Sequence, residues 1–281
     1  MTAQNQPFAR TDEQYWERTW IHSDLPLPVD LNDHSLRNHA TLTLHAFFEQ
    51  AMAPISGRGG SLIELGCAHS KWLPYFARRF GLQVTGLDYV ECGCETSRDM
   101  LHAAGVSGAI VHGDVFNPPH DLIGRFDVVY SAGLVEHFES TASAISACAA
   151  FAKPGGLIVT IVPNLTGLIG LLQRVLDRQV YDKHIVLGPD QLRVAHEAAG
   201  LTVMDCRYLL SANFAVMNHP AIRPMVLNKA IRGMLIAATL AVWLLEYVVT
   251  IPPSRLLSPY IACVARYRST ASAPAGDLKS E

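Results

Sequence analysis

The sequence predicts an open, doubly wound α/β domain, and three observations support this fold class. The chain has 281 residues, which suits one large α/β domain or two small ones. Hydrophobic residues make up 49% of the chain and charged residues 17%, so the chain can bury a large core. Apolar segments of strand length alternate with helical patterns, and residues 61–73 combine a buried strand, a tight turn and a helix start.

Composition and charge exclude several classes of partner. The net charge is −3 and no block of Lys and Arg stands out, so we expect no nucleic-acid partner. The 6 cysteines match neither a zinc pair nor a disulfide framework, and Cys92 and Cys94 are expected to be small residues that open a helix. No cluster of metal ligands is visible, which predicts no metal. The N-terminal residues are polar, without an apolar signal core, so we expect a cytoplasmic enzyme with reduced thiols.

A short N-terminal helix is expected after a loose start, with Thr11 as its cap. Tyr15, Trp16 and Trp20 form an aromatic face on this helix. These rings either pack the segment onto the core or form a lid over a ligand. As a lid, they would wall a pocket for an apolar or aromatic substrate. A second helix is expected at residues 33–52.

The turn after the first strand has the features of a nucleotide site. Glu64 lies in this strand and Gly66 follows it; glycine has no Cβ, so the backbone can approach a ligand closely. The dinucleotide fingerprint requires glycine at the first, third and sixth positions of the turn, which are Gly66, Ala68 and Lys71 here. The pattern is instead Glu-x-Gly-x-Ala-x-Ser, with the small residues Ala68 and Ser70 in place of further glycines.

The next segments predict the second and third strands. After a helix at residues 71–80, residues 83–88 form a strand that ends in Asp88. In doubly wound folds a carboxylate at this position can accept hydrogen bonds from both hydroxyls of a ribose. Its alternative role is to cap the next helix, which is expected at residues 94–104. A short strand is expected at residues 109–112.

A titratable pair follows the fourth strand, which is expected at residues 126–131. Glu136 and His137 lie beyond the carboxyl end of this strand, where open α/β sheets bind ligands. His137 can take a proton from a substrate hydroxyl, thiol or amine. The alternative is a packing role, in which Glu136 orders the backbone and His137 fills the wall beside a cofactor. A Lys-Pro-Gly-Gly turn at residues 153–156 then leads into a fifth buried strand at residues 157–164.

Taken in order, these motifs resemble those of class I S-adenosylmethionine-dependent methyltransferases over residues 60–165. The resemblance rests on the Glu-x-Gly turn, the acids Asp88 and Asp114, the Phe-Asp-x-Val strand with its Glu-His pair, and the Lys-Pro-Gly-Gly turn. It implies a seven-stranded Rossmann-like sheet of order 3-2-1-4-5-7-6, with the last strand antiparallel. It also implies S-adenosylmethionine as the methyl donor and S-adenosylhomocysteine as the product.

The resemblance further implies roles for particular residues. Asp88 holds the ribose, and Asp114 with the backbone of Val115 holds the adenine. The residues expected to bind the cofactor are Glu64, Gly66, Cys67, His69, Asp88, Tyr89, Asp114, Val115, Ser131 and Ala132. Residues 165–190 are expected to roof the substrate pocket, with a plain surface loop as the alternative. The candidate catalytic residues are Glu136, His137, Tyr181 and His184.

We expect one methyltransferase domain over residues 1–281. Its predicted parts are N-terminal lid helices at 1–57, a Rossmann-like core at 58–210 and 257–268, an apolar helical cap insert at 211–256 and a loose tail at 269–281. The insert separates the last two strands of the sheet. It therefore leaves the core and returns to it.

The cap insert contains the least usual stretch of the chain. Residues 233–245 carry no charge, although an acid follows them. A membrane span requires ~20 apolar residues, and a span here would have to leave and re-enter one sheet. We therefore expect the helix around residues 230–250 to be buried in the cap or in a homodimer interface. The second alternative is a helix that docks on a membrane surface, and the third is a true span. Lys229, Arg232 and Arg255 flank this helix.

The predicted function is methyl transfer from S-adenosylmethionine to an oxygen, sulfur or nitrogen of a small-molecule acceptor. The mechanism would be in-line displacement at the methyl carbon, which depends mainly on positioning. One alternative is a membrane-surface methyltransferase of lipids or quinones, because the cap insert is apolar. A second is a non-catalytic cofactor-binding or interaction protein, because Ala68 and Ser70 alter the glycine turn.

Overall fold

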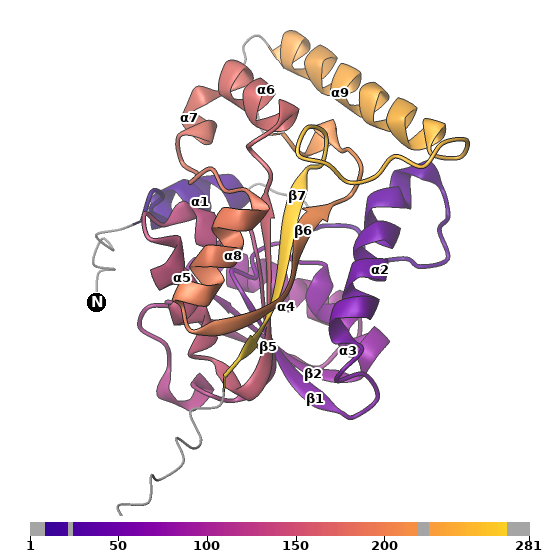
Figure 1. Cartoon of the computed structure of the whole chain (residues 1–281). Helices are drawn as coiled ribbons and strands as arrows, with labels where there is room; N and C mark the ends of the chain where they lie inside the picture. Colours follow the sequence, from indigo (N-terminus) through magenta and orange to yellow (C-terminus); the bar gives the residue numbers. More distant parts are fainter. Residues whose placement is uncertain (1–8, 22–24, 218–224, 269–281) are drawn as a thin grey trace, which may run out of the picture.

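The computed structural model describes residues 9–21, 25–217 and 225–268, which form one open sheet with helices around it (Figure 1). The 7 strands have the order β3-β2-β1-β4-β5-β7-β6. Their bounds are β1 Gly60–Leu65, β2 Leu82–Asp88, β3 Gly108–His112, β4 Phe126–Ala132, β5 Ala152–Pro163, β6 Leu201–Leu209 and β7 Tyr260–Tyr267. β7 runs antiparallel to both of its neighbours. The predicted fold class and strand order are confirmed. The expected loose ends at residues 1–10 and 269–281 lie outside the described residues, except for Ala9 and Arg10, whose backbones contact Phe138 and His137.

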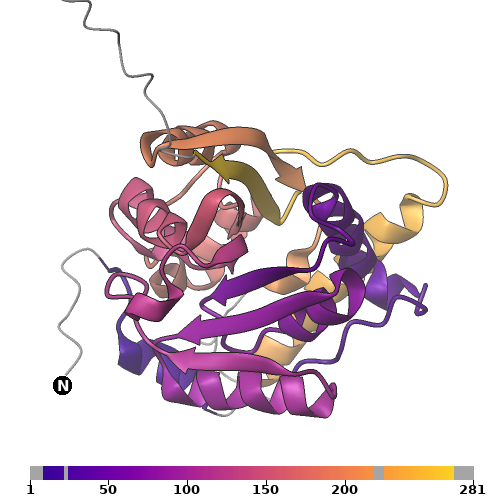
Figure 2. The same cartoon turned by 90° about the horizontal axis from the view of Figure 1, so that it is seen from below.

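Helices cover both faces of this sheet, as the view from below shows (Figure 2). The α-helices are α1 Glu13–Trp20, α2 His39–Met52, α3 Trp72–Phe80, α4 Glu91–Ala103, α5 Thr141–Ala149, α6 Leu168–Leu176, α7 Arg178–Tyr181, α8 Pro189–Ala198 and α9 Met225–Leu245. The short 3-10 helices are η1 Leu36–Asn38, η2 His120–Leu122, η3 Val135–His137 and η4 Phe214–Val216. Helices α2 and α3 pack in one apolar cluster on the sheet, and α5 and α8 pack in another.

Strand β1 is buried on both faces because its side chains alternate between these two clusters. Leu62 packs with Phe48 of α2 and Phe76 of α3. The next residue, Ile63, packs in the cluster that contains Ile145 of α5. Full burial of each such side chain contributes about 1.5–3 kcal/mol to stability. Burial on both faces explains why the central strands read as apolar runs rather than as alternating patterns.

The ends of two helices test the expected capping residues. Asp12, not Thr11, caps α1, because Oδ1 of Asp12 accepts a hydrogen bond from the backbone N of Tyr15 at 2.8 Å. The hydroxyl of Thr11 instead accepts a hydrogen bond from Nε1 of Trp16 at 3.0 Å. The expected end of α3 is confirmed, because Gly81 adopts a left-handed φ of 66°.

The Lys-Pro-Gly-Gly segment differs from the expected turn. Residues 153–156 belong to β5, which begins at Ala152, and the register with β4 shifts at this point. Nζ of Lys153 lies 2.8 Å from Oδ2 of Asp127, and the same oxygen accepts a hydrogen bond from the backbone N of Ser61 at 2.8 Å. Asp127 thereby joins the starts of β1, β4 and β5, so the segment is held as an irregular part of the strand.

The insert between β6 and β7 forms a long helix, α9, at one end of the sheet (Figure 1). The helix begins at Met225, ahead of the uncharged run at residues 233–245, and ends at Leu245. Strand β6 runs parallel to β5, because both are antiparallel to β7. The chain therefore enters the insert from the carboxyl end of the parallel strands, the end at which open α/β sheets bind ligands.

Candidate cofactor and acceptor site

The turn between β1 and α3 has the backbone conformation expected of a ligand-binding turn. Gly66 has a φ of 73°, which favours glycine, and its N donates a hydrogen bond to the carbonyl oxygen of Leu87 at 2.9 Å. A Cβ on Gly66 would lie 3.5 Å from Cδ1 of Leu134, a residue just after β4. The turn after β1 and the turn after β4 therefore lie side by side.

Glu64 is buried beside this turn, with 3% of its surface exposed. Its Oε2 accepts a hydrogen bond from Oγ of Ser70 at 2.7 Å, and the same Oγ accepts one from the backbone N of Trp72 at 3.0 Å. Burial raises the pKa of Glu64 to about 8, so the carboxyl is mainly protonated near neutral pH. Ser70 thus links the acid to the start of α3. Sequence reasoning missed this role, because it treated Ser70 only as a small substitute for glycine.

Asp88 joins the end of β2 to the turn after β1 and to the start of α4. Its Oδ2 accepts a hydrogen bond from the backbone N of Ala68 at 2.9 Å, and its Oδ1 accepts one from the backbone N of Val90 at 2.9 Å. The bond to Val90 agrees with the alternative role at the helix start. Each oxygen keeps a further lone pair, so the carboxylate can also accept from a ribose. Ribose binding by Asp88 stays a prediction.

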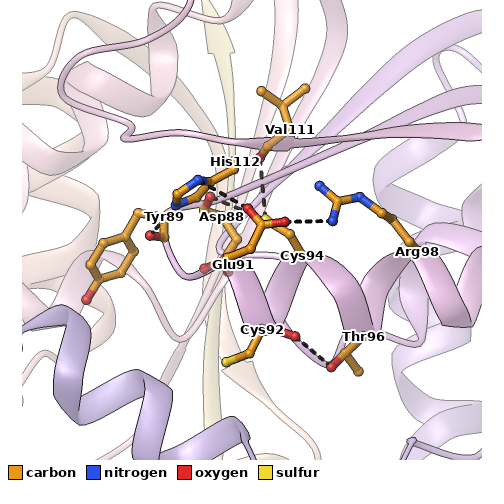
Figure 3. Close-up of polar contacts among 9 residues, drawn as sticks. All are labelled: Asp88, Tyr89, Glu91, Cys92, Cys94, Thr96, Arg98, Val111 and His112. Atoms are coloured by element: carbon orange, nitrogen blue, oxygen red, sulfur yellow. Dashed lines mark hydrogen bonds and ion pairs between the residues drawn. The ribbon is translucent and has the colours of Figure 1, made fainter. Parts of the chain in front are cut away.

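A glycine on α4 explains how Ala68 fits into the turn. A Cβ on Gly93 would lie 2.6 Å from the Cβ of Ala68, which is closer than two such atoms approach in real proteins. Helix α4 can therefore approach the turn only because Gly93 lacks a side chain. Figure 3 shows this end of α4, where Oε1 of Glu91 accepts a hydrogen bond from Nη1 of Arg98 at 2.8 Å.

Three other residues that were predicted to bind the cofactor, Cys67, His69 and Tyr89, have side chains in three different surroundings. The Sγ of Cys67 is buried 2.6 Å from the position that a Cβ on Gly86 would take, so the thiol fills space between β1 and β2. His69 has a φ of 56°, and its ring stacks on Trp20 of α1 with 4.8 Å between ring centroids. The ring of Tyr89 points away from the carboxylate at the end of β2 (Figure 3), and burial raises the pKa of its hydroxyl.

The predicted adenine residues lie in a tight loop after β3. Oδ1 of Asp114 accepts a hydrogen bond from the backbone N of Phe116 at 2.9 Å, and its carbonyl oxygen accepts one from the N of Asn117 at 3.1 Å. Val115 is buried and packs in the same apolar cluster as Leu87 of β2. This loop therefore borders the end of β2, which agrees with one ligand reaching both strands.

The segment after β4 holds a buried acid without a hydrogen-bond partner. Ser131 is buried at the end of the strand, whereas the next residue, Ala132, is exposed. Glu136 is 1% exposed, and among the described residues neither of its carboxyl oxygens has a hydrogen-bond partner. Burial raises the pKa of Glu136 to about 8. Buried polar groups in folded proteins normally have a partner, so this carboxyl is a candidate for binding a ligand.

His137 is held in one tautomer beside this acid. Its Nδ1 lies 3.0 Å from the carbonyl oxygen of Lys183, and because a carbonyl only accepts, Nδ1 carries the hydrogen. Nε2 therefore keeps a lone pair, and it lies 3.9 Å from Oε1 of Glu136. Burial lowers the pKa of His137 to about 3, so the ring is neutral at pH 7. Nδ1 of His184 lies 2.8 Å from the carbonyl oxygen of Val180, which assigns the same tautomer to this neighbouring ring.

Glu136, His137 and His184 form a cluster with metal-ligand geometry. Each offers one ligand atom, and these atoms lie within 4.8 Å of one another. Two neutral imidazoles and a carboxylate suit several divalent metals, and each ring donates its other N–H to a backbone carbonyl, as ligating histidines do. The absence of a metal stays a prediction of the sequence, and the geometry admits one.

Helix α1 places its aromatic face against both parts of the site. The ring of Trp16 meets that of His137 edge-on, with 5.0 Å between centroids, and stacks on Trp20 at 5.9 Å. Nζ of Lys183 lies 4.4 Å from the centroid of Tyr15. Trp16 and Trp20 are therefore brought to His137 and His69, and Tyr15 to Lys183. Tyr181, a candidate catalytic residue, packs instead against the apolar cluster that contains Leu165 and Phe214.

Sequence reasoning missed Arg10, which ties the N-terminal segment to the site. Its backbone N donates to the carbonyl oxygen of His137 at 2.7 Å, and its Nη1 donates to the carbonyl oxygen of Asp182 at 3.0 Å. Its Nε lies 3.0 Å from Oε1 of Glu139. These partners are far from Arg10 in the chain, so no local pattern could have indicated the contact.

The strand order agrees with the class of protein that the sequence motifs predict. The chain is a class I S-adenosylmethionine-dependent methyltransferase. Residues 36–205 match the family described as "Methyltransferase domain", and the chain belongs to this family.

Several ubiquinone biosynthesis O-methyltransferases are similar to this chain over most of their length. A ubiquinone biosynthesis O-methyltransferase of Neisseria meningitidis serogroup C (strain 053442) is 26% identical over 232 residues, which cover 74% of this chain and 87% of the relative. A protein of the same name from Bordetella pertussis (strain Tohama I) is 29% identical over 200 residues, which cover 62% of this chain and 81% of the relative.

Solved structures share the fold at low sequence identity. A putative sarcosine dimethylglycine methyltransferase from Galdieria sulphuraria has a TM-score of 0.59 and 15% identity, over 91% of this chain and 98% of that one. A geranyl diphosphate C-methyltransferase from Streptomyces coelicolor A3(2), solved with Mg²⁺, geranyl diphosphate and S-adenosylhomocysteine, has a TM-score of 0.57 and 15% identity, over 94% and 99%. At these identities the similarity establishes the fold and not the acceptor.

Proposed function

We propose that this methyltransferase acts on a hydroxyl oxygen of a small, apolar aromatic molecule, such as a hydroxylated precursor of a quinone. The observation that carries the proposal is the buried carboxyl of Glu136, which lacks a hydrogen-bond partner among the described residues and lies beside neutral His137. A polar group of a ligand would satisfy this carboxyl. Trp16, edge-on to His137, suits an aromatic ring of the acceptor. The names of the relatives support oxygen as the acceptor atom.

The residues of the cofactor end fit S-adenosylmethionine. The left-handed turn at Gly66 and the exposed residue Ala132 leave backbone accessible at the ends of β1 and β4. Asp88 would accept hydrogen bonds from the ribose hydroxyls, and Asp114 would accept one from the adenine amine. When bound, S-adenosylmethionine supplies an electrophilic methyl group and a sulfur that takes up the electron pair of the broken carbon–sulfur bond.

The acceptor end must hold the hydroxyl in line with the methyl group and remove its proton. Glu136 is the stronger base of the pair once ionised, because its pKa of about 8 lies far above that of about 3 for His137. We therefore assign the acceptor's proton to Glu136. Nε2 of His137 carries no hydrogen, so it would orient the acceptor by accepting a hydrogen bond from a second hydroxyl, such as that of a catechol. Oε1 of Glu136 and Nε2 of His137 lie 3.9 Å apart, so the two groups titrate as a coupled pair. Trp16 and Trp20 shield this end from water.

Ligand binding and acceptor choice test the proposal separately. Calorimetry should show that S-adenosylmethionine and S-adenosylhomocysteine both bind. A panel of catechols, hydroxyquinones, amines and thiols should then yield methylated product only with the hydroxylated aromatic molecules. Methylation of amines or thiols alone would contradict the oxygen acceptor. If neither cofactor form binds, the alternative of a non-catalytic interaction protein replaces the proposal.

A further inference from the structure

Helix α9 is attached to the domain along a single stripe. Near its carboxyl end, Nε1 of Trp243 donates a hydrogen bond to the carbonyl oxygen of Ala212 at 2.7 Å. One turn earlier, Oγ1 of Thr239 accepts a hydrogen bond from the backbone N of Phe214 at 2.9 Å. Leu235 also faces inward, in the apolar cluster of α6 and η4. Spacings of three to four residues put these side chains on one face of the helix.

The remaining face of α9 is exposed and apolar. Its large exposed side chains include Met225, Val226, Met234, Ile236, Leu244 and Leu245. Only 6% of its most apolar stretch of 18 residues is buried. The exposed apolar surface continues through residues 247–249. A surface helix of a soluble protein normally carries charged and polar residues on this face. Contiguous apolar surface of this kind marks an interaction site.

The connections of α9 favour a helix that lies on a surface over one that crosses a membrane. By length and composition alone, the helix could span a bilayer. However, the chain returns from it directly to the sheet, where Leu209 at the end of β6 pairs with Tyr260 at the start of β7. The hydrogen bonds to Ala212 and Phe214 also hold its inward stripe against the domain. Only the outward face is therefore available to a partner.

The charges around this face indicate what the partner is. Within residues 225–256, Lys229, Arg232 and Arg255 are exposed cations. The one acid of this segment, Glu246, has a side chain only 16% exposed, and its Oε2 lies 3.0 Å from Nε2 of His39. Such a surface complements anionic lipid headgroups. A second copy packed against the same face would bring cations together without exposed acids of this segment to pair with them.

We propose that α9 and residues 247–249 form a docking surface for the anionic lipid bilayer. The helix lies in the head-group region with Met234 and Leu244 toward the acyl chains, and Lys229 and Arg232 at the phosphates. The chain enters the insert from the carboxyl end of the parallel strands, so docking holds the acceptor end of the domain close to the membrane (Figure 1). The docking does not depend on which acceptor is methylated.

Sedimentation of the full-length protein with vesicles tests this surface. The protein should bind vesicles of phosphatidylglycerol and phosphatidylcholine, and Met234→Glu/Leu244→Glu should weaken that binding at least about tenfold, because an acid on the buried face is costly. Val194→Glu/Met204→Glu is the matched control, since both residues are exposed apolar side chains on α8 and β6. It should bind as the wild type does. Wild type that stays in the supernatant, or equal binding by both double variants, overturns the proposal.

Two further measurements separate the alternatives. Lys229→Glu/Arg232→Glu should weaken binding by about fivefold or more for each basic side chain and remove the preference for phosphatidylglycerol. Unchanged binding by this variant would overturn the anionic-lipid assignment. In sedimentation velocity without lipid, a wild-type dimer that Met234→Glu/Leu244→Glu converts to a monomer would assign the face to a second copy. Cofactor binding, measured by calorimetry on the same variants, should be unchanged, which keeps this test distinct from that of the proposed function.

Discussion

The cofactor end and the acceptor end of the site are built in different ways. At the cofactor end, Glu64 is bonded to Ser70, and both oxygens of Asp88 accept hydrogen bonds from backbone groups of nearby turns. At the acceptor end, Glu136 has no hydrogen-bond partner among the described residues, and His137 is held by segments far along the chain. An unpartnered buried group costs about 1–3 kcal/mol. We infer from this difference that the cofactor end is preformed, whereas the acceptor end gains its missing hydrogen bonds only when a ligand binds.

The largest expected effect is a loss of reaction rate when Glu136, the buried acid at the acceptor end, is replaced. Glu136→Gln keeps the shape of the side chain but cannot take a proton, so kcat should fall by about 10²–10⁴-fold. The affinity for S-adenosylhomocysteine should not change, because the cofactor end is intact. Steady-state kinetics and calorimetry measure the two quantities. Glu197→Gln, the same change at an exposed position of α8, should alter neither.

The pH dependence of the rate and the effect of chelators sharpen this result. In the wild type, kcat should rise with pH with a midpoint at about 8, because Glu136 must ionise, and the Gln variant should lack this rise. Metal chelators should leave kcat unchanged. A loss of activity that a divalent metal restores would assign Glu136, His137 and His184 to a metal site and contradict the direct role of the acid.

The next largest expected effect is a loss of cofactor affinity when Asp88 at the cofactor end is replaced. Asp88→Ala should weaken binding of S-adenosylmethionine and S-adenosylhomocysteine by about 1–3 kcal/mol, because the ribose hydroxyls lose their acceptor. The rate at saturating donor should change far less than in the Glu136 variant. Calorimetry measures the affinities, and thermal unfolding shows that the variant is folded. Asp121→Ala, at an exposed position of η2, should bind normally. Unchanged affinity in folded Asp88→Ala would refute the ribose assignment.

The packing of α4 on the cofactor turn gives a prediction for stability. Gly93→Ala should destabilise the fold by about 1–3 kcal/mol, because its new Cβ overlaps that of Ala68. Adding Ala68→Gly should restore most of this loss. Urea unfolding measures the free energy of unfolding of the single and the double variant. Gly233→Ala in α9, where a Cβ meets nothing within 4 Å, should instead stabilise the helix by roughly 0.5–1 kcal/mol. Equal losses in the single and double variants would mean that the two residues do not interact.

Both ends also contribute to the dependence of stability on pH. Burial raises the pKa of Glu64 and Glu136 from 4.5 to about 8, so the folded protein holds protons that the unfolded chain releases, and stability falls as pH rises through this window. Burial lowers the pKa of His137 from 6.5 to about 3 and that of His196 to about 4, so stability rises with pH up to about 6.5.

These opposing contributions predict a net decline only above the histidine window. Between pH values of about 4.5 and 6.5 the contributions of the two carboxyl groups and the two histidines offset each other. From about 6.5 to 8, of these four groups, only the two carboxyl groups contribute. The free energy of unfolding, measured with urea across this upper range, should therefore decrease. An increase would contradict the burial of neutral carboxyl groups at either end.

Local patterns were sufficient to predict most of the fold, whereas the binding roles of the residues at the cofactor end stay predictions. Apolar runs bounded by glycines predicted the central strands, because strands buried on both faces show no polar alternation. The left-handed turn at Gly66 and the position of Asp88 at the end of β2 were predicted, because both depend on neighbouring residues alone. Boundaries were less accurate where a tertiary contact decided them. Residues 153–156, for example, belong to β5 instead of a turn, and Lys153 among them lies 2.8 Å from Asp127 of β4.

The acceptor end and the cap insert needed the tertiary structure. Lys183 and Arg10 reach His137 only because the sheet brings distant segments together, and no spacing in the sequence encodes such contacts. The need for glycine at position 93 follows from the approach of α4 to Ala68, which only the tertiary structure shows. The sequence by itself determined that residues 233–245 are apolar. Only the packing of Trp243 and Thr239 decided which face of that helix is buried, because the same composition can fill a core or face outward.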